Sequence, residues 1–128
     1  MKIDKFTDLI TWQEAHKSVL DIYHVTKKFP KEELFGLTSQ MRRSAVSITS
    51  NIAEGFGRNT MRDKVHFFYQ ARGSMSELRN QLLIARDIKY ISESEYLVID
   101  TKIDDSQKLL HGLIRRTNQI ANHKSSVY

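Results

Sequence analysis

The chain has 128 residues, of which 27% are charged and 40% are hydrophobic, and its formal net charge is +5. This length suits one domain, and the ordinary composition argues against a disordered chain. The absence of cysteine excludes disulfides, thiolate metal sites and cysteine nucleophiles. One proline and five glycines supply too few turns for an all-β fold, so we expect an all-α protein.

The apolar stretches of the chain indicate a cytoplasmic protein. The first ten residues contain two acidic side chains and no apolar segment of a secretory leader. The longest purely aliphatic stretch, Leu82–Ala85, is far shorter than a membrane span. We therefore expect a cytoplasmic protein that does not enter a membrane.

The first predicted helix covers residues 11–28. Thr11 and Glu14 have the spacing of a capping box at its start, and Pro30 disfavours helix at its end. Its inward positions follow a spacing of three and four residues: Trp12, Ala15, Val19, Ile22 or Tyr23, and Thr26.

The second predicted helix covers residues 34–54, and Gly55 and Gly57 are expected to end it. Many small residues on this helix favour a close approach of its neighbours. Its apolar stripe consists of Leu37, Met41, Ala45, Ile48 and Ile52.

The third predicted helix covers residues 61–90, and the fourth covers residues 93–122. Thr60 with Asp63 and Ser92 with Glu95 form capping boxes at the two starts. Ile91 also stands where a hydrophobic staple to Tyr96 is expected. The third helix carries a heptad seam of Phe68, Ala71, Met75, Leu78, Leu82 and Ala85.

These helices predict one domain over residues 1–128, an antiparallel up-down four-helix bundle with a loose tail at 123–128. Helices of roughly 30 residues are about 45 Å long, whereas the first two helices are only about 30 Å long. The ends of the two long helices are then left uncovered unless another subunit covers them.

The residues that carry a family resemblance begin with FPKEELFGLTSQMRRSAVSITSNIAEGFGRNT (29–60) and continue with HFFYQARGSMSEL (66–78). Together with Asp8, Leu9, Trp12, Tyr23 and Thr26, they resemble the four-helix bundle proteins encoded by intervening sequences of bacterial 23S rRNA genes. The chain is also similar to the accessory protein of diversity-generating retroelements. The resemblance implies a homopentameric barrel, a basic surface that binds nucleic acid, and no catalysis. In the retroelement relative, the pentamer also binds a reverse transcriptase.

Positive charge gathers in the middle of the chain. Residues 41–89 contain nine basic and four acidic residues, an excess equal to the whole net charge. Arg72, Arg79 and Arg86 recur every seven residues and have no acidic neighbour three or four positions away. Such a row suits contact with a phosphate backbone, but it also suits ion pairs with Asp100, Asp104 or Asp105 of the fourth helix. Both interpretations stay open at this point.

Four further arginines complete the candidate nucleic-acid-binding set. Arg42 and Arg43 are adjacent on a helix and point about 100° apart, so one site does not easily hold both. Arg58 either contacts nucleic acid or, with Glu54, ties the turn to the third helix. The full candidate set is Arg42, Arg43, Arg58, Arg62, Arg72, Arg79 and Arg86.

Three consecutive aromatic residues on the third helix cannot all enter one seam. Phe68 has the core position, so Phe67 and Tyr69 are the candidates for a subunit contact, with base stacking as the alternative.

No cofactor, metal site or catalytic group is expected. The five histidines lack the spacing of metal ligands, and Gly55 and Gly57 belong to no phosphate-binding motif. Ser74 lacks the context of a serine nucleophile, and Glu77 is expected to bond across the bundle rather than act as a base. We therefore expect a non-catalytic protein that binds RNA or DNA. The alternative is a protein-interaction scaffold, for example an accessory subunit of a reverse transcriptase.

Overall fold

The computed structural model of the chain describes the backbone of residues 2–127 and the side chains of residues 2–122. Four α-helices dominate the described chain, which has no strand: α1 (Ile10–Thr26), α2 (Leu37–Phe56), α3 (Met61–Asp87) and α4 (Glu93–Val127). Two short 3-10 helices, η1 (Phe6–Asp8) and η2 (Lys31–Glu33), precede α1 and α2. The predicted all-α class with four helices is confirmed.

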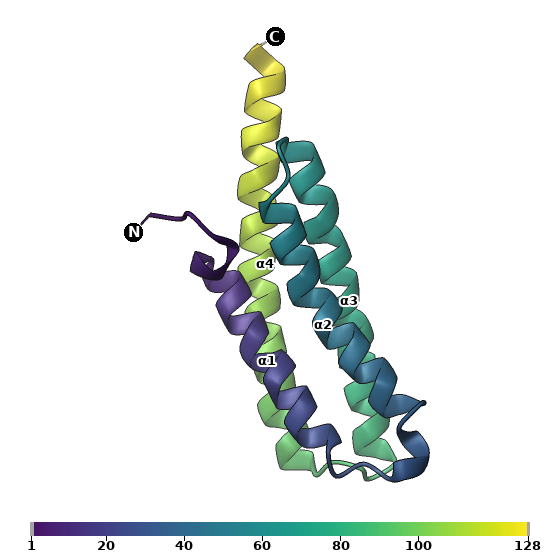
Figure 1. Ribbon diagram of the computed structural model, residues 1–128. Coiled ribbons are helices and arrows are strands. Elements are labelled where there is room, and N and C mark those ends of the chain that lie inside the picture. The colour runs from purple at the N-terminus through teal and green to yellow at the C-terminus, as the bar shows by residue number, and fades with distance from the viewer. Residues whose placement is uncertain (1, 128) are drawn as a thin grey trace.

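The helices alternate in direction along the chain, and Figure 1 shows α1 and α3 descending while α2 and α4 ascend. Each helix packs against the next one in sequence, and α1 also packs against α4. The C-terminal end of α4 projects beyond the other three helices (Figure 1). Within residues 2–127, no helix combines the length and apolarity that a membrane crossing requires.

The core lies along the facing stripes of the four helices. All six seam positions predicted on α3 are at most 2% exposed, which confirms that seam. On α2 the predicted stripe is buried from Met41 to Ile52, and Leu37 packs against its edge. On α1 the core position belongs to Ile22, whereas Tyr23 is 40% exposed.

The sequence predicts capping boxes at three helix starts, and the hydrogen bond to the capping hydroxyl forms at two of them, while the full reciprocal box forms only at Ser92. The Thr60 hydroxyl accepts a hydrogen bond from the Asp63 N–H at 3.1 Å. Ser92 and Glu95 form a reciprocal box, with distances of 3.1 Å and 2.8 Å. The capping box predicted at Thr11 is wrong because α1 begins at Ile10, which places Thr11 inside the first turn, where it is buried.

Helices α2 and α3 end at other residues than predicted, at Phe56 instead of 54 and at Asp87 instead of 90. Gly55 does not end α2: it lies inside the helix, and only Gly57 forms the C-cap, at a negative φ. Helix α3 ends at Asp87 because Lys89 takes a left-handed conformation with φ 67°. Lys89 and Tyr90 then donate backbone hydrogen bonds to the last carbonyls of the helix, as in a Schellman motif.

The tail predicted to be loose from residue 123 is helical in its backbone as far as Val127, and Tyr128 lies outside the described residues. At the start of α2, Leu34–Gly36 stay outside the helix. The helix begins only at Leu37, whose N–H donates to the Glu33 carboxylate at 3.2 Å.

Candidate nucleic-acid interface

Arg79 lies in the contact between α3 and α4, where it binds side chains of α4. Its Nε and Nη2 donate to the two carboxylate oxygens of Asp100 at 2.9 Å and 3.1 Å. Its Nη1 donates to Asp104 at 3.1 Å and to Gln107 at 2.8 Å. The hydrogen bond to Asp100 raises the pKa of the Arg79 guanidinium above its already high value. Of the two interpretations of this arginine, the ion pair with the fourth helix is therefore the one that the structure contains.

Arg86 is also occupied within the chain. Its Nε donates to Asp87 at 2.9 Å and lies 3.9 Å from Glu93, which follows the turn into α4. The guanidinium stacks over the Tyr96 ring at 4.7 Å from the ring centroid. The hydrogen bond to Asp87 raises the pKa of Arg86. The three heptad-spaced arginines thus do not share one role.

Arg72 is the arginine of the row whose charge is not paired with a described carboxylate. Its guanidinium lies over the ring of Tyr69 at 4.7 Å, and the side chain is exposed. The Tyr69 hydroxyl in turn accepts a hydrogen bond from the Asn118 amide at 3.1 Å. Among the residues with described side chains, no carboxylate pairs with Arg72. The cation is therefore oriented by an aromatic face without being neutralised.

Arg72 lines a hollow between α3 and α4, which we call the α3–α4 groove. Its volume is about 370 Å³. It is lined by Arg72, His111, Ile114, Arg115, Asn118, Gln119 and Asn122. Cations and amides dominate this lining, and it includes no Asp or Glu. A surface with that chemistry suits a negatively charged ligand.

Sequence reasoning missed the part of this groove that α4 contributes. The charge count singled out residues 41–89 and so passed over His111 and Arg115. A signal was nevertheless present, because His111, Arg115, Asn118 and Asn122 follow steps of four, three and four. That spacing places polar, hydrogen-bonding side chains on one face of a helix.

The two adjacent arginines of α2 diverge, as their spacing predicted. Arg42 turns toward α1, where its Nε donates to the Thr26 hydroxyl at 2.9 Å and its guanidinium covers the Tyr23 ring at 4.9 Å. Arg43 turns toward α3 and pairs with Glu77 at 2.7 Å. Glu77 thus bonds across the bundle, as expected from the sequence.

Arg58 ties the turn after α2 to both neighbouring helices. It pairs with Glu54 at 3.2 Å, and its guanidinium stacks over the Phe67 ring at 4.5 Å. Nearby, burial lowers the pKa of Lys64, whose ammonium donates to the Phe56 carbonyl.

Arg62 is exposed and has no ion-pair partner among the described side chains. The seven candidate arginines therefore lie on several faces, and only Arg72 enters the α3–α4 groove.

The two aromatic residues predicted at a subunit contact are each covered by a cation of their own chain. Arg58 lies over Phe67, which is half-buried, and Arg72 lies over Tyr69, which is 40% exposed.

No group of three or more His, Asp or Glu side chains within the described residues is arranged to hold a metal ion.

Comparison with known proteins places the chain in a family. The sequence profile of the 23S rRNA-intervening sequence protein family matches residues 7–112, which is most of the chain. No curated protein gives a significant match.

A similar solved structure is a protein with unknown function from the S23 ribosomal protein family of Bacteroides thetaiotaomicron VPI-5482. It superposes with a TM-score of 0.77 at 22% sequence identity, over 82% of this chain and 98% of that chain. This likeness establishes the shared fold. On the match of its sequence profile, the chain belongs to the 23S rRNA-intervening sequence protein family.

Proposed function

We propose that this protein is a non-catalytic, cytoplasmic nucleic-acid-binding protein that holds RNA or DNA by its phosphate backbone in the α3–α4 groove. The observation that carries this proposal is the lining of the groove, where Arg72 and Arg115 stand among amides without a carboxylate. Guanidinium groups match the geometry of phosphate oxygens and form charge-assisted hydrogen bonds with them. The name of the family makes structured RNA the first nucleic acid to test.

The neighbours of Arg72 support this role. Tyr69 holds the guanidinium from one side, and Asn118 fixes the Tyr69 hydroxyl, so the cation is positioned before a ligand arrives. The amides of Gln119 and Asn122 add hydrogen-bond donors to the same groove. Contacts of this kind position a backbone and carry little sequence information, so we expect binding that tolerates sequence changes.

The proposal includes no catalytic step, and the hydrogen bond of Ser74 is consistent with this. Ser74 is hydrogen-bonded to the hydroxyl of Ser47 at 2.8 Å rather than to a histidine. A serine nucleophile needs an adjacent general base, and Ser47 cannot serve as one.

We further propose that the antiparallel bundle assembles into a homopentamer, with Phe67 and Tyr69 near the subunit contact. The family resemblance supports this assembly, and so does the end of α4, which projects beyond its own bundle (Figure 1). The same projecting end favours the alternative function, a scaffold that serves as an accessory subunit of a reverse transcriptase. The mass of the nuclease-treated protein in solution tests the assembly, with five chains as the expected result.

The experiment that tests nucleic-acid binding measures the affinity of a labelled structured RNA across a salt series. Released counterions make the affinity fall steeply with salt, and each lost phosphate contact makes that dependence shallower. The double variant Arg72→Gln/Arg115→Gln should bind more weakly, with a salt slope lower by about 1 to 2 units. Both side chains are exposed, so the variant is expected to fold normally.

Arg42→Gln is the matched control, because Arg42 also lacks a carboxylate partner among the described side chains but lies outside the groove. It should leave the salt slope unchanged. An affinity that is flat across the salt series would contradict the proposal and favour the scaffold. Equal losses per removed charge in both variants would show that overall charge, not the groove, holds the nucleic acid.

A further inference from the structure

A second open surface lies far from the α3–α4 groove, where α1 leads through η2 into α2. Two hollows of about 510 Å³ and 420 Å³ adjoin there and share Leu34, Thr38 and Arg42. We call this region the α1–α2 surface. The residues that characterise it are Tyr23, Lys27, Lys31, Leu34, Phe35, Arg42 and Val46.

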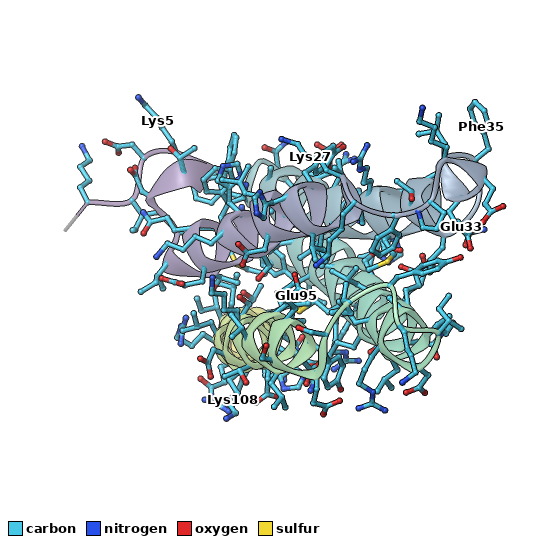
Figure 2. The ribbon with its side chains drawn as sticks, turned by 90° about the horizontal axis from the view of Figure 1, so that it is seen from below. Lys5, Lys27, Glu33, Phe35, Glu95 and Lys108 are labelled. Atoms are coloured by element: carbon cyan, nitrogen blue, oxygen red, sulfur yellow. The ribbon has the colours of Figure 1, made fainter. Side chains whose placement is uncertain are left out.

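Exposed apolar side chains set this surface apart. Phe35 is 93% exposed, and Figure 2 shows its ring pointing away from the bundle. Leu34 is 51% exposed and Val46 is 40% exposed beside the same hollow. A cluster of exposed apolar side chains around a concave surface is typical of an interaction site.

The charged side chains that line the two hollows have one sign. Lys27, Lys31, Arg42 and Arg43 line the two hollows, and no Asp or Glu lines either of them. Arg43 is paired with Glu77, but Arg42 keeps its two terminal nitrogens free of described hydrogen bonds. The Thr26 hydroxyl and the Tyr23 ring hold Arg42 in place, so its fork is positioned for an incoming carboxylate.

The occupant is unlike a nucleic acid. Leu34 and Val46 gain from contact with other apolar side chains, which a phosphate backbone does not offer. The α3–α4 groove shows the contrast, because one aliphatic side chain, Ile114, stands there among cations and amides. The combination of cations and aliphatic groups therefore fits a protein segment that carries both acidic and apolar side chains.

Carboxylates for this surface are scarce on the chain itself. Among the residues with described side chains, all but three Asp and Glu carboxylates already make an ion pair or a hydrogen bond. The three exceptions are Glu32, Asp63 and Asp105, which lie on η2, α3 and α4 respectively. A second copy would therefore bring these cations few carboxylates that lack a partner of their own. The 3-10 helix η1 and the C-terminal end of α4 also lie away from this end of the bundle (Figure 1).

We propose that the α1–α2 surface docks a partner protein through a short acidic segment that presents a Leu or Phe side chain. The apolar side chain packs against Phe35 and Leu34, and a neighbouring carboxylate pairs with Arg42. This surface and the α3–α4 groove are separate, so this proposal does not depend on nucleic-acid binding.

Fluorescence anisotropy with three labelled synthetic peptides tests the proposal on the full chain. One peptide combines Glu with Leu and Phe, the second replaces Leu and Phe by Ser, and the third replaces Glu by Lys. Only the first should bind saturably. Phe35→Ala and Arg42→Gln should each weaken its binding by about tenfold, as expected for residues at the centre of a contact.

The controls separate this proposal from its competitors. Leu97→Ala removes a 53% exposed apolar side chain elsewhere and should leave peptide binding unchanged, as should Arg72→Gln/Arg115→Gln. Equal binding of the Ser peptide, or no saturable binding of the Glu peptide, would overturn the proposal. A changed solution mass of Phe35→Ala with unchanged peptide binding would assign the surface to a second copy. Weaker RNA binding by that variant, with the peptide displaced by RNA, would assign it to nucleic acid.

Discussion

Gly55 on α2 lies directly against the ring of Phe68 on α3. A Cβ atom added at Gly55 would lie 2.7 Å from Cε1 of Phe68 and 3.1 Å from the Lys64 carbonyl oxygen. Phe68 is only 2% exposed, so its ring has no free space into which to move. This glycine is therefore a packing residue that sets how closely α2 and α3 approach each other.

Gly55→Ala should destabilise the protein by about 1 to 3 kcal/mol, because it overpacks a filled contact. Urea unfolding, followed by circular dichroism, measures the change. An unchanged unfolding midpoint would mean that the two helices move apart at little cost.

Gly73→Ala should have the opposite effect. Gly73 lies inside α3, and a Cβ atom there would meet no atom within 4 Å. Among the described residues, no neighbour therefore packs closely against this glycine. Alanine should raise the free energy of unfolding by about 0.5 to 1 kcal/mol, because it restricts the unfolded chain and favours helix. The same urea experiment tests both glycines, and a loss of stability in Gly73→Ala would reveal a contact across this exposed face.

Lys89→Gly should stabilise the turn between α3 and α4. Lys89 holds φ at 67°, a left-handed conformation that costs a side-chain-bearing residue about 1 kcal/mol or more. Glycine adopts it without that cost, although it also makes the unfolded chain more flexible. We expect a net gain of several tenths of a kcal/mol to about 1 kcal/mol in thermal or urea unfolding. Lys89→Ala is the control, and it should bring no gain because it retains the Cβ atom.

Acid should weaken the bridge between α2 and α3. A hydrogen bond from the Ser44 hydroxyl, with help from Arg43, lowers the pKa of Glu77 below its ordinary value of 4.5. Since the folded pKa lies below the unfolded one, the stabilisation is complete above pH 4.5 and is lost as the pH falls through the folded value. Glu77→Gln should therefore be less stable than the wild type near neutral pH and equal to it once Glu77 is protonated.

The measurement is urea unfolding of both proteins over a series of pH values. Asp105→Asn is the control, because Asp105 has no ion-pair or hydrogen-bonding partner among the described side chains. Asp105→Asn should change the free energy of unfolding by the same small amount at every pH. A Glu77→Gln deficit that persists in acid would instead assign the effect to packing or hydrogen bonding of the neutral side chain.

The helices and their buried stripes could be predicted because each depends on a spacing within one segment. The α3 seam from Phe68 to Ala85 repeats at steps of three and four, and only one face of a helix satisfies that repeat. The end of α2 could not be predicted in this way. Whether Gly55 stops a helix or admits a neighbour depends on Phe68, which comes from another helix.

The candidate site was less predictable for the same reason. The heptad spacing of Arg72, Arg79 and Arg86 describes α3, but their partners lie elsewhere. Arg79 meets two aspartates of α4, whereas Arg72 meets Tyr69 and a groove without acids. An arginine's role depends on what the neighbouring helix places opposite it, and one helix's sequence does not contain that information.

The contacts of Arg79 also have a consequence for the alignment of the two long helices. Heptad seams of similar residues can slide past each other by one repeat and still bury apolar side chains. Arg79 bonds to Asp100, Asp104 and Gln107, a set that spans about two turns of α4. A slip of seven residues would place Glu93, Leu97 and Asp100 opposite it, or Gln107, His111 and Ile114. The first set keeps two carboxylates but loses the amide, and the second set has no carboxylate. Arg79 therefore favours the observed axial alignment of α4 against α3, and with it the height of the α3–α4 groove along the bundle.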